Sequence, residues 1–231
     1  MKKIIAAAMA ALLGITALTA CGDKEDGASE SGILGAGGQD IPDDYSLAGD
    51  GMEYGASVVE LKPETNENVR VMICFDKRYF SEEEYGAIYK ISDYIAAINN
   101  NDHQLIDEIF YDGYLDYAAG QMGMDDSDAY IDSFETSLTE SLGEDFEIDY
   151  IDVSACYDAE DSASATSFEQ ADEILTQLAG DDILDKVDYR RVVEIGGNTT
   201  YKTPQGNYLF TNHERPFMLC IYRIDGEYYL F

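Results

Sequence analysis

The chain has 231 residues, and its 47 acidic side chains against 14 lysines and arginines leave a net charge of −33 at pH 7. Because nucleic acid is itself negative and no basic stripe interrupts the sequence, this balance excludes a direct nucleic-acid binder. Hydrophobic residues make up 45% of the chain and aromatic residues 12%, which excludes wholesale disorder. The length suits one domain with a hydrophobic core of its own.

The N-terminus combines a basic start, a short apolar stretch and a cysteine. Two lysines precede the apolar residues 4–18, and the stretch closes with Leu-Thr-Ala-Cys, ending at Cys21. A membrane-spanning anchor is the alternative, but the stretch is short for a span. The pattern resembles a bacterial lipoprotein signal with its lipobox. The resemblance implies that residues 1–20 are removed and that Cys21 carries diacylglycerol, which holds the mature protein at the extracytoplasmic face of the cell membrane.

The composition changes after this signal. Residues 22–50 are rich in Gly, Ser, Ala and Asp and hold almost no large apolar side chains. Such a segment buries too little surface to order itself, which predicts a flexible acidic Gly/Ser-rich tether over residues 21–50. Residues 51–231 are then expected to form a single domain.

Three further cysteines lie in apolar, strand-like stretches, at Cys74, Cys156 and Cys220. Their odd number and wide spacing exclude a full disulfide framework. We expect buried thiols that pack as small hydrophobic groups, and pairing of two of them stays open.

The first half of this domain reads as a hairpin followed by helices. Residues 56–61 and 69–75 are β-rich and predict the two strands of a hairpin. Ser81 and Glu84 form a capping-box pattern, and isoleucines then recur at 3-4-3 spacing up to an asparagine run at 99–101. Two more helices are expected, one capped by Asp102 and one over residues 127–142, before Gly143.

The second half reads as strands with one more helix. Apolar residues alternate from 146 to 155 but change phase midway, which predicts a β-bulge that bends the strand. A helix over residues 167–180 follows, and then a run of short strands separated by turns. These strands are expected at 187–195, 199–202, 207–211, 217–224 and 227–231. The fold class is therefore α+β, with N-terminal helices packed on a bent antiparallel sheet and preceded by a β-hairpin.

Two segments carry a family resemblance. Residues 88–111, IYKISDYIAAINNNDHQLIDEIFY, are similar to the opening helices of nuclear transport factor 2-like domains, and residues 217–231, FMLCIYRIDGEYYLF, to the last hairpin of that family. The resemblance covers residues 81–231 and implies the cone-shaped, ketosteroid-isomerase-like fold. The early hairpin and the helix at 167–180 depart from that pattern. Members of the family include isomerases, dehydratases and non-catalytic binding modules, so the fold by itself does not decide the function.

A cone fold would bring its first helices against the concave face of the sheet. Large residues expected in that region either fill it or line a small pocket for a modest apolar ligand. A Tyr/Asp pair there could transfer protons, as in a cone-fold isomerase, but the region holds no histidine to act as a base near neutral pH. The candidate pocket residues are Phe110, Tyr114, Asp116, Tyr117, Ile148, Tyr150, Cys220 and Tyr222.

Metal binding has one weak candidate. The two histidines, His103 and His213, have no second histidine or cysteine at ligand spacing, so zinc is not expected. Oxygen side chains after residue 157 follow EF-hand spacing, but Ala163 stands where that loop needs glycine, and a strand precedes it. A polar loop capped by Thr166 or Ser167 is the favoured interpretation. The weak calcium candidates are Asp158, Glu160, Ser162, Ser164, Thr166 and Glu169.

The sequence favours a lipid-anchored, non-catalytic binding module at the extracytoplasmic face. It contains no Gly-x-Ser-x-Gly, His-Glu-x-x-His or Cys-x-x-Cys motif. We expect no cofactor, membrane contact through the lipid on Cys21, and either an envelope protein or a small apolar ligand as partner. The alternatives are a cone-fold enzyme of isomerase or dehydratase type and a weakly calcium-binding adhesion module.

Overall fold

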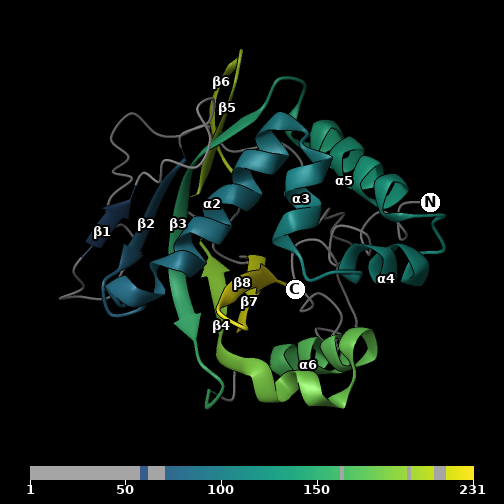
Figure 1. Ribbon diagram of the computed structural model, residues 1–231. Coiled ribbons are helices and arrows are strands. Elements are labelled where there is room, and N and C mark those ends of the chain that lie inside the picture. Colours follow the sequence, from purple (N-terminus) through teal and green to yellow (C-terminus); the bar gives the residue numbers. More distant parts are fainter. Residues whose placement is uncertain (1–57, 62–70, 162–163, 197–198, 211–216) are drawn as a thin grey trace, which may run out of the picture.

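A computed structural model describes residues 58–61, 71–161, 164–196, 199–210 and 217–231 (Figure 1). The expected signal peptide, Cys21, the expected tether over residues 21–50, and Ser162 all lie outside the described residues. The domain is α+β, as expected, with helices packed on a sheet.

The described strands join in one sheet with the order β1-β2-β3-β4-β7-β8, and a β5–β6 hairpin lies beside β3. All described strand pairs are antiparallel except β2–β3, which is parallel, a pairing that the expected antiparallel sheet did not include. The strands are β1 (Val58–Leu61), β2 (Met72–Asp76), β3 (Glu147–Tyr157), β4 (Val187–Ile195), β5 (Thr200–Thr203), β6 (Gly206–Leu209), β7 (Phe217–Ile224) and β8 (Glu227–Leu230).

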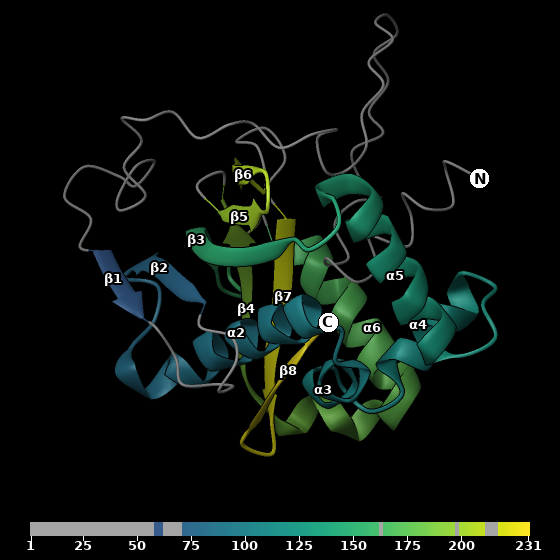
Figure 2. The same ribbon diagram turned by 90° about the horizontal axis from the view of Figure 1, so that it is seen from above.

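The helices cover the sheet unevenly. Helix α2 contacts β3 and β8, whereas α6 contacts β7, and α4 packs on α5. Figure 2 shows α4, α5 and α6 gathered beyond one side of the strands. The helices are α2 (Tyr85–Asn100), α3 (His103–Ile109), α4 (Tyr114–Gln121), α5 (Ser127–Leu142) and α6 (Ala165–Ala179), with the 3₁₀ helices η2 (Glu82–Glu84) and η3 (Asp181–Lys186).

Local capping signals set the helix boundaries. The Ser81 backbone N–H donates to the Glu84 carboxylate at 2.7 Å, which confirms the capping box. Asn101 has φ 51°, the left-handed conformation that ends α2. The Asp102 carboxylate then accepts from the Leu105 N–H at 3.1 Å and begins α3, as expected. Helix α6 begins two residues before the expected Ser167 and ends at the expected glycine, Gly180.

Helix α4 was not expected from the sequence. It has eight residues and follows Gly113, whose φ of 79° favours glycine. So short a helix is marginal by itself, and its stability depends on tertiary packing. Leu115, Ala118 and Ala119 are buried, which supplies that packing.

Strand β3 bends, as the phase change in its sequence predicted. Its pairing shifts register between Ile148 and Tyr150 on β5, and again between Val153 and Ala155 on β4. The first half of β3 therefore pairs with β5 and the second half with β4. The Asn99 amide of α2 holds the bend, because it donates to the Ile148 carbonyl at 2.8 Å and accepts from the Ile148 N–H at 2.9 Å.

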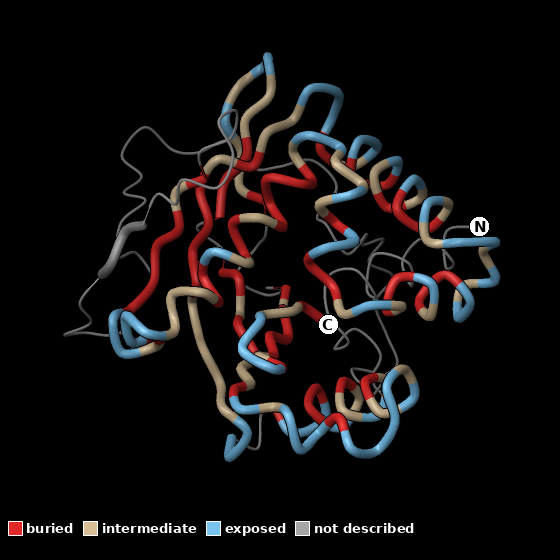
Figure 3. The backbone as a smooth tube through the Cα atoms, in the orientation of Figure 1, coloured by how far each residue is buried: buried red, intermediate tan, exposed pale blue. Residues whose placement is uncertain are grey.

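The core lies between the sheet and the inner faces of the helices, where Figure 3 shows the buried residues gathered. Cys74 and Cys220 are buried, and Cys156 is partly buried. This agrees with the expectation that they pack as small hydrophobic groups.

Candidate functional site

A cleft of about 780 Å³ lies along the first half of β4. Five consecutive residues of that strand, 187–191, line it. The other walls come from η2, from the turn that follows β3, from α6 and η3, and from Arg223 on β7. A cleft of this size is within the usual range of binding sites, roughly 300–1,000 Å³.

The cleft exists because β3 is too short to pair with the whole of β4, and the first half of β4 extends beyond it. The pairing of the two strands ends with Tyr157 opposite Val192. Val187 and residues 189–191 pair with β7 on one side, with a register shift at Asp188. Among the described residues no strand pairs with residues 187–191 on the other side. This half of β4 is therefore an open strand edge inside a cleft.

The cleft wraps around this edge and reaches both faces of the sheet. Neighbouring side chains of a strand point to opposite faces. Arg190 Nη1 donates to Asp172 Oδ2 of α6 at 2.8 Å, whereas Arg191 Nη2 lies 3.5 Å from Glu84 Oε1 of η2. Helix α6 and η2 therefore lie on opposite faces of β4, with the open edge between them.

The charge in the cleft is mostly paired. It holds three of the six arginines of the chain and six carboxylates. In addition to the two ion pairs above, Arg223 Nε donates to Asp188 Oδ1 at 2.7 Å. The remaining carboxylates, Glu83, Asp158 and Glu160, have no lysine or arginine partner among the residues described. The cleft therefore keeps a surplus of negative charge.

Tyr189 is the least satisfied polar residue in the cleft. The guanidinium groups of Arg191 and Arg223 lie over its ring, at 5.1 and 5.8 Å from the centroid. The side chain is 8% exposed, and its hydroxyl has no hydrogen-bond partner among the described residues. Buried polar atoms almost always have a partner, so this hydroxyl is available to a ligand group that reaches it.

Three titratable groups in and beside the cleft have pKa values that are shifted away from neutrality. Burial raises the pKa of Cys156 to about 12, and burial also raises the pKa of Tyr189 above its usual range. The hydrogen bond from Arg223 holds the pKa of Asp188 below its usual value. At neutral pH these groups keep one protonation state, which suits recognition better than proton transfer.

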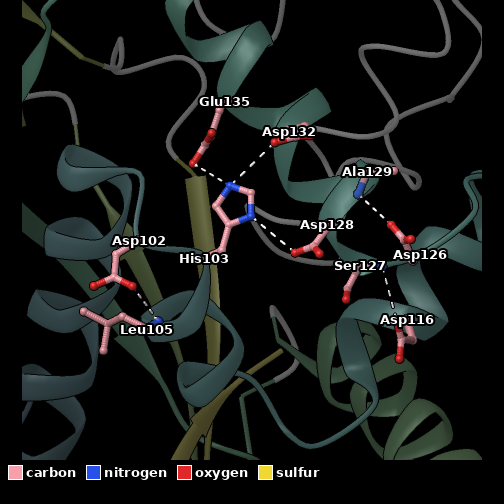
Figure 4. Close-up of polar contacts among 10 residues, drawn as sticks. All are labelled: Asp102, His103, Leu105, Asp116, Asp126, Ser127, Asp128, Ala129, Asp132 and Glu135. Atoms are coloured by element: carbon pink, nitrogen blue, oxygen red, sulfur yellow. Dashed lines mark hydrogen bonds and ion pairs between the residues drawn. The ribbon is translucent and has the colours of Figure 1, made fainter.

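A second polar cluster joins α3 to α5 (Figure 4). His103 Nδ1 lies 3.3 Å from Asp128 Oδ1, and His103 Nε2 lies 3.4 Å from Glu135 Oε1 and 3.6 Å from Asp132 Oδ1. Partial burial disfavours the charged imidazole, but the hydrogen bond to Asp128 and the charges of Glu135 and Asp132 outweigh it and raise the pKa of His103. The cluster is a pH-sensitive ion-pair network.

Three residues of this cluster also bring potential metal-ligand atoms together. Among the described residues, His103, Asp132 and Glu135 bring one potential ligand atom each within 4.8 Å of one another. Asp132 is 71% exposed, and exposed acidic groups of this kind are common in an acidic protein without an ion. Ion pairing with the imidazole accounts for the arrangement. The sequence signal for the cluster was the spacing of Asp128, Asp132 and Glu135 at i, i+4 and i+7, which puts the three acids on one face of α5.

Four of the candidate pocket residues lie in or beside one aromatic cluster. Phe110 stacks on Tyr114 with ring centroids 5.3 Å apart, and Tyr114 meets Phe231 at 5.6 Å. Phe231 also contacts Tyr222, and its N–H donates to the carbonyl of Cys220 at 2.9 Å. All these side chains are buried, and none of them lines the cleft beside β4.

The other pocket candidates are dispersed. Asp116 is exposed and accepts from the Ser127 N–H at 3.2 Å, so its carboxylate binds the first residue of α5. Tyr117 is half-buried on α4. Tyr150 and Ile148 lie on β3 opposite Thr200 and Tyr201 of β5, and both are buried.

The EF-hand-like segment forms a turn. The Ser164 hydroxyl donates to the carbonyl oxygens of Asp158 and Asp161, at 2.9 and 3.0 Å. The Glu160 N–H donates to the Asp158 carboxylate at 2.9 Å. Thr166 and Glu169 are exposed on α6. Among the described residues, no carboxylate of this segment belongs to a group that could hold a metal ion. Two of these carboxylates, Asp158 and Glu160, line the cleft.

None of the described helices has both the length and the apolar character needed to cross a bilayer. Comparison with protein-family models, with curated proteins and with solved structures found no match.

Proposed function

We propose that the protein is a non-catalytic binding module of the bacterial cell envelope, held at the extracytoplasmic face by a lipid on Cys21. The observation that carries the binding role is the cleft along the open edge of β4. Within the described part of the chain, it combines a strand edge that no other strand pairs with, fixed ion pairs and a buried tyrosine hydroxyl that lacks a hydrogen-bond partner. These features offer hydrogen bonds and charge to a ligand.

The chemistry of the cleft supports binding over catalysis. A general base works best when its pKa is near the working pH, and a nucleophile needs an adjacent base. The pKa values of Cys156 and Tyr189 are raised and that of Asp188 is lowered, so none of the three lies near neutral pH. The arginines are held by carboxylates.

The lipid anchor rests on the sequence. Lys2, Lys3, the short apolar stretch and the residues up to Cys21 follow the lipoprotein pattern. A chain with a net charge of −33 is repelled by anionic head groups, so the lipid would supply the membrane contact. The proposal includes a resemblance of the domain to the nuclear transport factor 2-like fold, with an interior that is filled by aromatic side chains.

A ligand screen tests the binding role. The full-length protein in detergent micelles is exposed to a panel of small apolar compounds and of acidic, neutral and basic peptides, and hits are detected by thermal shift and mapped by amide hydrogen exchange. We expect hits that protect residues 187–191 and that mass spectrometry recovers unchanged. A ligand that is chemically converted, or a panel whose hits all map away from the cleft, contradicts the proposal.

Two matched variants sharpen this screen. Leu184 and Tyr89 are the two large hydrophobic residues that are exposed in the described structure, and only Leu184 lines the cleft. Leu184→Ser should weaken a hit at the cleft, while Tyr89→Ser should leave its binding unchanged. Equal effects of both variants would place the ligand elsewhere.

A further inference from the structure

We infer that the cleft binds an extended, basic segment of a partner protein, which adds to the sheet as a strand beside residues 187–191 of β4. This inference rests on the proposed function and names the partner class for the same site.

The backbone of β4 provides the template. Alternate residues of a strand direct their N–H and C=O groups toward each neighbour, and residues 187–191 have a described neighbour only in β7. Five residues extend about 16 Å, which matches a typical strand of roughly five or six residues. The Arg190 carbonyl accepts from Arg191 Nη1 at 3.2 Å, a bond that an incoming peptide N–H would replace. The main-chain groups on the open side can then pair with an extended peptide, which is the recognition mode of β-augmentation.

The two walls of the cleft fit the alternation of side chains along an added strand. Residues of the ligand would point by turns toward the η2 side, where Tyr189 and Arg191 lie, and toward the α6 side, where Arg190 is paired with Asp172. On the η2 side, the Tyr189 hydroxyl lacks a described partner and can bind a polar side chain. Leu184 at the rim offers apolar contact.

Charge selects a basic segment. Each of the three arginines is held by one carboxylate, while Glu83, Asp158 and Glu160 have no basic partner among the residues described. Lysine or arginine side chains of a ligand would neutralise this surplus, and the overall charge of −33 steers a basic partner toward the protein. The chain's own residues 21–50 hold eight acids and one lysine, so electrostatics disfavour them as the occupant.

The test uses three synthetic peptides of about seven residues, the length of a short strand. The first alternates lysine and valine, the second replaces each lysine by glutamate, and the third is the first with every backbone N–H methylated. Binding to the full-length protein in detergent micelles is measured by calorimetry, and the site is mapped by amide hydrogen exchange.

We expect the basic peptide to slow exchange at residues 187–191. It should bind at least about tenfold more tightly than either the acidic or the methylated peptide, because the acidic peptide meets like charge and the methylated peptide cannot donate main-chain hydrogen bonds. A double variant, Glu83→Gln with Glu160→Gln, should weaken the basic peptide, while the matched control Glu140→Gln on the exposed face of α5 should not. Thermal melting of each variant checks that folding is retained.

The outcomes separate this inference from the proposed function. If the methylated peptide binds at the cleft as tightly as the unmethylated one, strand addition is wrong and the cleft remains a binding site. If no peptide protects residues 187–191 but a compound of the earlier panel does, the basic strand is the wrong occupant. If nothing binds there, both proposals fail. A concentration-dependent dimer with protected residues 187–191 would assign the edge to a second copy of the chain and overturn the inference.

Discussion

The ring of Phe231 lies against the ring of Tyr222, with centroids 5.0 Å apart and planes inclined by 61°. Phe231 also contacts Tyr111, between α3 and α4, and Tyr114, the first residue of α4, so one side chain after β8 joins β7 to both. This cluster contains Tyr114 and Tyr222, two of the residues expected to line or fill a pocket, and neither lines the cleft beside β4.

Phe231→Ala should therefore destabilise the protein strongly. Replacing a buried phenylalanine by alanine removes about 3–5 kcal/mol from the free energy of unfolding, because the contacts are lost and a cavity remains. Urea denaturation followed by circular dichroism measures the change. Tyr89→Ala, at a side chain that is 46% exposed, is the control and should change stability by less than about 0.5 kcal/mol. Equal effects of the two substitutions would show that the cluster is not part of the core.

Asp172 should couple Tyr222 to Arg190. The Tyr222 hydroxyl donates to Asp172 Oδ1 at 2.7 Å, and Arg190 Nη1 donates to Asp172 Oδ2 at 2.8 Å. Tyr222→Phe should cost about 1 kcal/mol, and Asp172→Ala about 1–3 kcal/mol because it leaves both donors without their acceptor. In a double-mutant cycle measured by urea denaturation, the two losses should be less than additive. Additive losses would mean that the hydroxyl and the carboxylate do not interact.

The His103 cluster should make stability depend on pH. The pKa of His103 is raised in the folded protein above the ordinary value of about 6.5. The protonated imidazole therefore stabilises the fold fully below about pH 6.5, and this contribution is lost as the pH rises through the folded pKa. For partly exposed pairs we expect less than about 1 kcal/mol.

The measurement compares the free energy of unfolding of the wild type and of His103→Asn between about pH 5.5 and about pH 8.5, which brackets histidine titration. The difference should be largest at the acidic end and shrink toward the alkaline end. Asp128→Asn should lower the pKa of His103 in an NMR titration, because it removes the negative charge beside Nδ1 that favours the protonated imidazole. A difference independent of pH would contradict this assignment.

Cys21→Ser should release the protein from the membrane. Without the thiol no diacylglycerol can be attached, and the acidic chain has no basic patch to hold it at anionic lipids. Fractionation after a salt wash, with labelled palmitate to follow lipidation, measures the effect. Lys24→Ser, close to the same site, is the control and should stay lipidated. If the Cys21→Ser protein remains bound after the wash, residues 4–18 anchor it as a membrane span instead.

Several elements of the fold could be predicted because their signals are local. Strands β4 and β7 have the expected bounds, since each is an apolar run between turn residues. Helix α5 also has its expected bounds, because Asp126 caps its first turn and Gly143 follows its last. The bend in β3 was visible as a change of phase, which shows where a strand leaves one neighbour for another.

The site depended on contacts that no local pattern contains. Glu84 and Arg191 are 107 residues apart in the sequence, and Arg190 and Asp172 belong to elements whose packing had to be known first. Helix α4 was missed because its stability comes from packing, and the hydrogen bond of Asp116 to the Ser127 N–H likewise depends on how α4 packs on α5. The sequence by itself determined the α+β class and most element boundaries, because capping and alternation act within a few residues. Only the tertiary structure decided where the pairing of β3 with β4 ends. The end of this pairing leaves the open strand edge on which the proposed function depends.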